Sequence, residues 1–225
     1  MWLINSSIGR KLIMSISGIF LVLFLLFHSL MNIVVIISPS GYNAICAFLG
    51  ANWYAVVGTA VLAGGFVIHI LYALFLSYQN LRARGSESYA VTKNQKSVEW
   101  ASQNMLILGA VIFGFLALHF YNFWFKMQFA ELTGYEGGQF LPSNGAAFVK
   151  DLFSNWIYCV VYIVWLSALW FHLTHGVWSS LQSIGLNNKT WLPRVKVISN
   201  IISTIVILMF MSIPLYFLIG CTSGC

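Results

Sequence analysis

Five long runs of apolar residues divide this chain, and short polar segments separate them. Each run has at least the roughly 20 residues that a helix needs to cross the hydrocarbon core of a bilayer. Lipid offers the backbone no hydrogen-bond partner and the runs lack the alternation of a barrel strand, so each is predicted to be helical. The predicted spans are residues 12–37, 53–81, 100–126, 153–185 and 197–220.

Composition and charge agree with a membrane protein that forms a single domain over residues 1–225. Hydrophobic residues make up 60% of the chain and charged residues 7%, a balance that a soluble domain of this length cannot bury. The net charge of +6 does not indicate a nucleic-acid partner, because the basic residues sit in short connections and form no patch. The sequence predicts an all-α membrane protein with five transmembrane helices in a bundle.

The lysines and arginines also predict an orientation. Nine of the 11 basic residues lie before the first span or in the second and fourth connections, and only Lys126 and Lys150 lie on the other side. Basic connections face the cytoplasm, so we expect a cytoplasmic N-terminus and an outer C-terminus. Tryptophans near the predicted span ends are interpreted as interfacial anchors: Trp2, Trp53, Trp100, Trp124, Trp156 and Trp191.

Two connections and the C-terminus are predicted on the outer side. Residues 38–52 are expected to begin as a turn and run into a short interfacial helix, and residues 127–152 to form a long loop. The four cysteines show neither CxxC nor CxxCH spacing, which excludes covalent attachment of a c-type haem. Cys221 and Cys225 either form a disulfide outside the cytoplasm or remain two thiols at a frayed terminus.

Four histidines lie inside four different apolar runs. At about 1.5 Å per residue, His28 and His119 lie roughly 10–15 Å below the outer ends of their helices. His69 and His172 lie roughly 25–30 Å below those ends. The four therefore form an outer and an inner pair, each drawn from two helices, and tilt is too small to merge the two layers.

An imidazole at this depth is a functional-site hypothesis by default and is the commonest axial ligand of haem iron. A single intramembrane histidine more often links helices through a hydrogen bond, but four in two matching layers favour two non-covalent b-type haems. Small residues near the inner pair, Gly65 and Gly176, would leave space for a flat macrocycle. His175 lies one turn from His172, and on position alone either could be the inner ligand.

Short segments around these histidines match a known family. They are Phe27-His28-Ser29-Leu30-Met31-Asn32, His69-Ile70-Leu71-Tyr72, Leu118-His119-Phe120, Phe171-His172 with Gly176-Val177-Trp178-Ser179, and Leu192-Pro193-Arg194. With these segments the whole chain resembles the dihaem cytochrome b subunit of succinate:quinone oxidoreductases, the succinate dehydrogenases and fumarate reductases with a single five-helix anchor. The FHxxxGxWS pattern at 171–179 is the most specific.

The resemblance implies a ligand set. His28 and His119 would bind the outer haem iron, and His69 and His172 the inner one, with His175 as a non-ligating neighbour. The implied haem surroundings are Arg10, Lys11, Gly65, His175, Gly176 and Trp178. A quinone, usually menaquinone in dihaem members, is expected near the outer haem, with the candidate polar residues Ser29, Asn32, Tyr121, Asn122 and Lys126.

The resemblance also implies a division of labour within an enzyme complex of the bacterial cytoplasmic (inner) membrane. A flavoprotein subunit with FAD would interconvert succinate and fumarate, and an iron–sulfur subunit would relay electrons. This membrane-embedded subunit would hold the haems and the quinone site, and electrons would cross it between the quinone and the iron–sulfur subunit as part of a respiratory chain. Such complexes can pair as dimers. No Asp or Glu lies in a predicted span interior, which argues against a carboxylate-based proton path through this subunit.

Two alternatives remain open at this point. One is the b-type cytochrome anchor of a hydrogenase or nitrate reductase, which the FHxxxGxWS segment disfavours. The other is a small transporter without haem whose histidines relay protons. The sequence does not distinguish succinate oxidation from fumarate reduction.

Overall fold

The computed structural model describes residues 6–84, 100–135 and 138–222, and these residues form helices and turns without a strand. Five helical segments are long and apolar enough to cross a membrane, as the sequence predicts: Ser7–Ile37, Trp53–Ala83, Met105–Thr133, Trp156–Ser183 and Trp191–Gly220. Four of these segments are single helices: α2 (Ser7–Ile37), α4 (Trp53–Arg84), α9 (Trp156–Ser183) and α10 (Trp191–Thr222). The third span consists of three consecutive elements: α6 (Met105–His119), η1 (Phe120–Phe129) and α7 (Ala130–Thr133). A short α5 (Trp100–Gln103) precedes α6.

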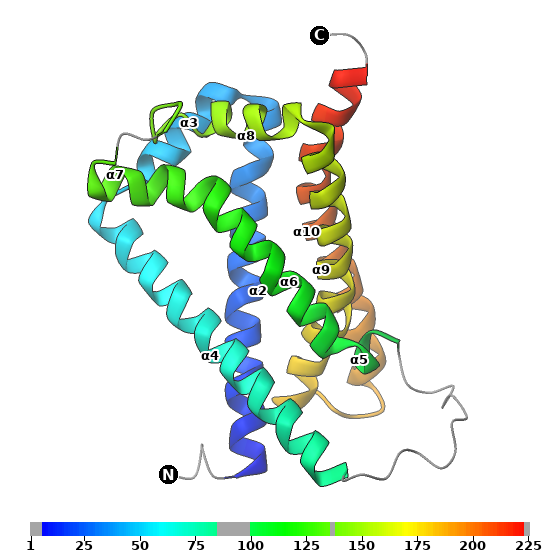
Figure 1. Ribbon diagram of the computed structural model, residues 1–225. Helices are drawn as coiled ribbons and strands as arrows, with labels where there is room; N and C mark the ends of the chain where they lie inside the picture. Colours follow the sequence, from blue (N-terminus) through cyan, green and yellow to red (C-terminus); the bar gives the residue numbers. More distant parts are fainter. Residues whose placement is uncertain (1–5, 85–99, 136–137, 223–225) are drawn as a thin grey trace.

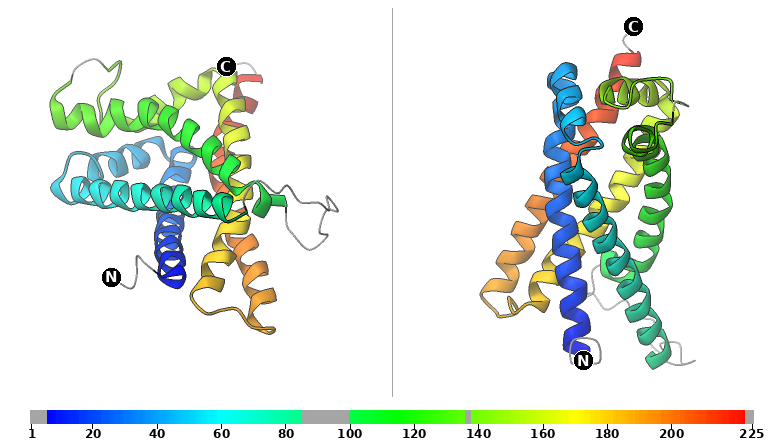
Figure 2. Two further views of the ribbon diagram at one scale, coloured as in Figure 1. Left: turned by 60° about the horizontal axis from the view of Figure 1, so that its bottom comes forward. Right: turned by 90° about the vertical axis from the view of Figure 1, so that its left-hand side faces the viewer.

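Helix α2 stands in the middle of the bundle and packs against α4, α9 and α10 (Figures 1 and 2). Helices α9 and α10 run side by side and make the most extensive contact, and the small side chains of Ser199 and Ser203 on α10 are fully buried. In contrast, α4 buries none of its most apolar stretch against the rest of the chain, whereas α9 buries 33% of its own. Helix α4 is therefore attached mainly through α2.

Two short helices, α3 (Pro39–Phe48) and α8 (Gly145–Ser154), lie across the end of the bundle opposite the start of α2 (Figure 1). The Asn43 side chain joins them, because its amide donates to Asn144 Oδ1 at 2.9 Å and its carbonyl oxygen accepts from the Ala146 N–H at 2.9 Å. We call α3 and α8 together the outer cap.

The outer cap corrects the prediction of a long loop over residues 127–152. The third span continues as helix to Thr133, where Gly134 ends it at a φ of 67°, and α8 occupies much of what remains. The first connection also differs from its prediction, because Ser38 accepts from the Gly41 N–H at 3.1 Å and α3 starts directly at Pro39 without a preceding turn.

Caps explain where other spans begin. Asn155 accepts from the Ile157 N–H, so α9 starts at Trp156 and not at residue 153. Asn188 Oδ1 accepts from the Trp191 N–H at 2.7 Å, and α10 starts there, six residues before the predicted 197. Pro193 is tolerated because the first turn of a helix does not use its N–H groups within the helix.

The third span changes its helical repeat directly after His119. Residues Phe120–Phe129 form a π-helix, with i to i+5 hydrogen bonds, and such segments are frequent at functional sites. The buried Gln128 fixes this segment, since its side-chain oxygen accepts from Thr59 Oγ1 at 2.8 Å and its amide donates to the Gly50 carbonyl at 3.0 Å. The outer ends of α4 and the third span are thus tied together.

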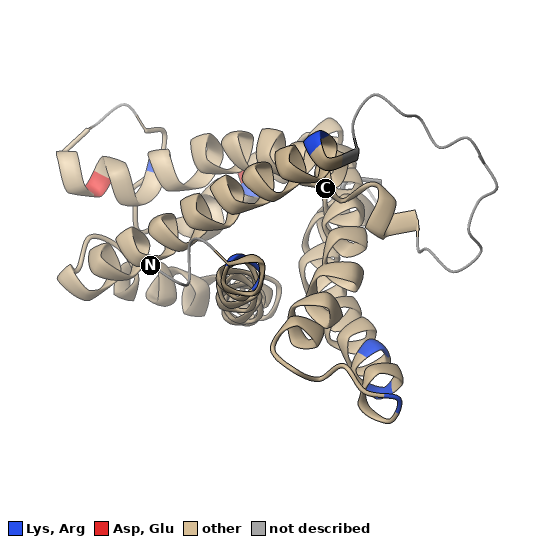
Figure 3. Cartoon of the chain, turned by 90° about the horizontal axis from the view of Figure 1, so that it is seen from below, with Lys and Arg blue, Asp and Glu red and all other residues tan. Residues whose placement is uncertain are grey.

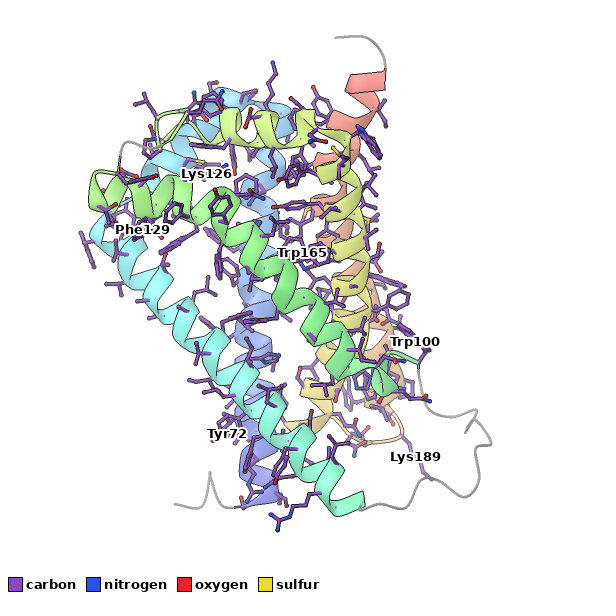
Figure 4. The ribbon with its side chains drawn as sticks, in the orientation of Figure 1. Tyr72, Trp100, Lys126, Phe129, Trp165 and Lys189 are labelled. Atoms are coloured by element: carbon purple, nitrogen blue, oxygen red, sulfur yellow. The ribbon has the colours of Figure 1, made fainter. Side chains whose placement is uncertain are left out.

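The described basic residues gather mainly at the end of the bundle where α2 begins and α4 ends (Figure 3). Lys189 and Lys126 lie at opposite ends in Figure 4. Trp53, Trp156 and Trp191 each begin a span and are 78%, 61% and 47% exposed, as anchors would be. Trp2, Lys93, Lys96, Cys225 and the side chain of Cys221 lie outside the described residues.

Candidate functional site

The outer pair of histidines meets between α2 and the end of α6. The ring centroids of His28 and His119 are 6.0 Å apart, and the two rings are perpendicular. Phe24 stacks on His28 at 5.1 Å, one turn away along α2, and Phe210 of α10 approaches the same ring at 5.6 Å. On the other side, Trp165 of α9 lies 5.6 Å from His119. Aromatic rings thus enclose the outer pair.

The inner pair meets between α4 and α9. The ring centroids of His69 and His172 are 6.3 Å apart, at 68° between the planes. Glycines from two further helices face these rings: a Cβ on Gly18 would lie 3.6 Å from His69 Cε1, and one on Gly109 would lie 3.9 Å from His172 Cε1. Small residues, and no aromatic side chains, therefore lie against the inner pair at these two points.

The two pairs lie at different depths. Gly18 of α2 is level with His69, and His28 follows it by 10 residues, which is about 15 Å along the helix axis. The third span gives the same spacing, because Gly109 is level with His172 and His119 again follows by 10 residues. Two independent helices thus place the pairs about 15 Å apart.

Within each pair, the Nδ1 atoms of the two histidines differ in their polar neighbours. His28 Nδ1 lies 3.2 Å from Asn32 Nδ2, and His69 Nδ1 lies 3.4 Å from Ser17 Oγ. The buried Nδ1 atoms of His119 and His172 have no hydrogen-bond partner among residues 6–84, 100–135 and 138–222. Each pair therefore has one histidine that a neighbouring polar side chain contacts and one without such a contact.

More buried polar atoms lie on the outer side of His119. Tyr162 is 6.3 Å from His119 and 5.4 Å from Trp165 between ring centroids, and Trp165 projects between α6 and α9 in Figure 4. Within the described chain, Trp165 Nε1 has no hydrogen-bond partner, and the Tyr162 hydroxyl and the Asn122 side chain lie near each other without a hydrogen bond of good geometry. Buried donors without partners are costly, so this region is suited to a group that brings acceptor oxygens.

The geometry of both pairs can be compared with that of a metal site. Two imidazoles that bind one metal ion from opposite sides have ring centroids about 6 Å apart, because each metal–nitrogen bond is about 2.0 Å. The observed separations of 6.0 and 6.3 Å agree with this value. Among the described residues no group of three or more His, Cys, Asp or Glu could hold a metal alone. Each pair thus offers two imidazoles, and no further side-chain ligand of these types completes a metal site among the described residues.

The other predicted haem neighbours make contacts of their own. Gly65 makes room for the ring of Phe20, since a Cβ there would lie 2.6 Å from Phe20 Cε1. A Cβ on Gly176 would lie 4.0 Å from Met105 Cε. Arg10 donates to Gln79 Oε1 at 2.8 Å and so joins α2 to α4. Lys11 is exposed.

His175 lies beside Trp178, with ring centroids 4.9 Å apart, and Lys196 of α10 stacks over the Trp178 ring at 4.2 Å. The ring of His172 lies against that of His69, and His175 is close enough to His172 to interact with it electrostatically.

The five residues proposed for a quinone are not brought together as one set. Ser29 is fully buried and donates to the Leu26 carbonyl, and Asn32 is bonded to His28. Tyr121 is 60% exposed, and Lys126 lies over its ring at 5.5 Å. Of these residues, Asn122 is buried on η1, and its side chain lies near the Tyr162 hydroxyl.

The outer cap contributes residues that sequence reasoning did not single out. Tyr42 of α3 donates to Asn32 Oδ1 at 3.0 Å, and burial raises the pKa of Tyr42, so its hydroxyl keeps its proton at neutral pH. Tyr42 packs close to Gly145 of α8, where a Cβ would also collide with Cys46. Phe153 of α8 lies 5.1 Å from Tyr162. The cap therefore covers the outer pair from above.

The fold and site define a five-span helical membrane protein with two half-buried histidine pairs between its helices. No protein-family model, curated protein or solved structure matches the chain.

Proposed function

We propose that this chain is the membrane-anchor and electron-transfer subunit of a quinone-linked respiratory enzyme of the succinate dehydrogenase and fumarate reductase class, and that it binds two b-type haems. The observation that carries the proposal is the meeting of four histidines from four spans as two pairs, 6.0 and 6.3 Å between ring centroids. The family resemblance of the segments around these histidines supplies the choice of enzyme class.

In this proposal His28 and His119 would hold the outer haem, and His69 and His172 would hold the inner one. When bound, the haems supply one-electron redox chemistry that amino-acid side chains lack. The protein holds the ligands on rigid helices and keeps water away: Phe24, Phe210 and Trp165 enclose the outer pair, and the outer cap covers it. Asn122, Tyr162 and Trp165 offer donors to acceptor oxygens at that level.

The finer parts of the proposal concern orientation and partners. The end rich in lysine and arginine would face the cytoplasm and receive the iron–sulfur subunit, which connects to the flavoprotein. Menaquinone would react near the outer pair, with Asn122 as the residue best placed to bond a quinone carbonyl. The membrane would be a bacterial cytoplasmic membrane.

The direct functional test uses membranes that contain the chain together with its native partner subunits. We expect succinate to reduce a b-type absorbance band and fumarate to reoxidise it, whereas hydrogen and nitrate leave the band unchanged. The matched control carries His69→Leu and His172→Leu, which should remove the inner part of the band. A haem band that responds to hydrogen or nitrate and not to succinate or fumarate would assign the chain to another class of b-type anchor. Colourless membranes would favour the transporter alternative.

A further inference from the structure

Helix α4 supplies His69 to the inner pair but packs weakly on the rest of the chain. It runs along the edge of the bundle in Figure 1, none of its most apolar stretch is buried, and it meets α2 far more than α6. A Cβ on Gly58 or Gly64 would meet nothing within 4 Å. Since lipid is as apolar as these side chains, such packing gives α4 little preference for one depth or one rotation.

Polar contacts hold the outer end of α4. The side-chain oxygen of Gln128 on η1 accepts from Thr59 Oγ1 of α4 at 2.8 Å and from Trp124 Nε1 at 2.9 Å. The amide of Gln128 donates to the Gly50 carbonyl at 3.0 Å, so three hydrogen bonds fix a side chain that is only 9% exposed. We call the hydrogen bond from Thr59 to Gln128 the outer clasp.

The inner end of α4 is held by α2 and not by the third span. Arg10 Nη1 donates to Gln79 Oε1 at 2.8 Å, and the same guanidinium group lies 5.3 Å from the centre of the Phe75 ring. The face of an aromatic ring attracts a cation, so both contacts draw α4 towards Arg10. We call the hydrogen bond from Arg10 to Gln79 the inner clasp.

The two clasps are placed evenly about His69. Thr59 precedes it by 10 residues and Gln79 follows it by 10, which is about 15 Å in each direction along the helix axis. At about 100° per residue, Thr59 and Gln79 lie about 160° apart around that axis, with His69 about 80° from each. One clasp thus pulls on each side of the helix, and the direction of His69 lies between them. A rotation or a slide of α4 that moved the His69 ring would strain both clasps.

We propose that the outer and inner clasps together position His69 for the inner haem, with Thr59 and Gln79 as positioning residues. This inference rests on the proposed haem at the inner pair. The other member of that pair does not depend on such clasps, because His172 lies on α9, which buries 33% of its most apolar stretch and packs extensively on α10.

The outer pair provides an internal reference. Its histidines come from α2 and α6, and the aromatic rings of Phe24, Phe210 and Trp165 around them belong to α2, α10 and α9. Since α4 contributes none of these groups, loss of a clasp should change the inner haem and leave the outer haem as it is.

The test is a redox titration with electron paramagnetic resonance of the oxidised intact complex. The inner signal is the one that the double variant His69→Leu, His172→Leu lacks. Thr59→Val, which removes the hydroxyl at nearly the same shape, and Gln79→Leu should each shift the potential and the resonance of the inner haem. Both changes together should cause loss of the inner haem. Thr59→Ser and Gln79→Glu keep the donor and the acceptor and should give the wild-type signal.

Thr133→Val is the matched control, because Thr133 donates to the Phe129 carbonyl in its own helical turn and makes no bond to α4. It should leave both haems unchanged. Circular dichroism of each variant gives a measurement that does not depend on haem, and we expect the wild-type helix content throughout. An altered inner haem in a chain of normal helix content then reports the placement of a ligand and not a failure to fold.

The outcomes separate the clasps from the proposed function. Wild-type inner signals in Thr59→Val, Gln79→Leu and their combination would overturn the inference. Equal changes in both haems would also overturn it, because the clasps would then support the bundle as a whole, and so would an inner signal that Thr59→Ser and Gln79→Glu alter as much as the other variants do. A wild-type chain that binds no haem would instead refute the proposed function.

Discussion

The outer and inner histidine pairs are built from similar geometry in different surroundings. The ring separations differ by 0.3 Å, 6.0 against 6.3 Å. The outer pair lies among aromatic rings under the outer cap and near a cluster of buried polar atoms. The inner pair has glycines against its rings and takes one histidine from α4, whose apolar stretch the chain leaves unburied. The comparison teaches that nearly equal spacing of two histidine rings can be held by dense aromatic packing in one place and by small residues in another.

The largest expected effect is the loss of one haem from a ligand variant. His28→Ala or His119→Ala should remove the outer haem and His69→Ala or His172→Ala the inner one, because a single imidazole leaves one axial position open. Haem content per chain and the potential of the remaining haem are the measurements. His175→Ala is the control and should keep both haems. The ligand assignment fails if His175→Ala loses a haem and His172→Ala does not.

The second largest effect is expected from filling the space that Gly18 leaves beside the His69 ring. Gly18→Leu should displace His69, since even the Cβ lies 3.6 Å from the ring, and forcing a larger side chain into such a contact costs about 1–3 kcal/mol. We expect reduced content of the inner haem with the outer haem retained. Gly18→Ala, whose methyl group makes an ordinary contact, is the matched control. Full content of both haems in Gly18→Leu would show that glycine is not needed there.

A third variant tests the outer cap. In Gly145→Ala the new methyl group would collide with Cys46 and press on Tyr42, which should destabilise the packing of α3 on α8 by about 1–3 kcal/mol. The thermal stability of the outer haem should fall while that of the inner haem stays unchanged. Adding Cys46→Ala should recover part of the loss. An equal loss of thermal stability for both haems would mean that the outer cap supports the whole bundle and not the outer pair in particular.

The smallest effect concerns the buried polar groups near the outer pair. In the haem-free chain, Tyr162→Phe should be neutral or stabilising by about 1 kcal/mol, because the buried hydroxyl lies near the Asn122 side chain without a hydrogen bond of good geometry. In the loaded complex the same change should be unfavourable if an acceptor oxygen pairs with that hydroxyl. Unfolding midpoints of the wild type and the variant, measured with and without haem, show whether the effect of Tyr162→Phe on stability changes sign. The same sign in both forms would exclude an acceptor at Tyr162.

The sequence predicts most of the fold because lipid leaves the backbone few choices. Five apolar runs give five spans, and the ends differ where local capping decides, as at Asn188 before α10. The segment 127–152 was harder, since a π-helix after His119 and the amphipathic α8 lack a strong signal in composition. Its interpretation as a loop was wrong for those helical parts.

The sequence predicts how deep the histidines of the candidate site lie along their helices, but it does not predict most of the contacts around them. Counting residues from span ends is enough to match His28 with His119 and His69 with His172, and the structure places these rings together. The contact from Asn32 could have been found, because it lies one turn from His28. Ser17, Gly18, Gly109 and Tyr42 could not, because their contacts depend on helix rotation and on the approach of elements distant in sequence.

The most direct test of the account is the amount of haem b bound per purified polypeptide, measured from the reduced pyridine adduct against protein mass. The account predicts two non-covalent haems per chain. A value of zero would contradict the haem sites altogether, and a value of one in the stable, fully loaded protein would contradict the claim that both histidine pairs are ligand pairs.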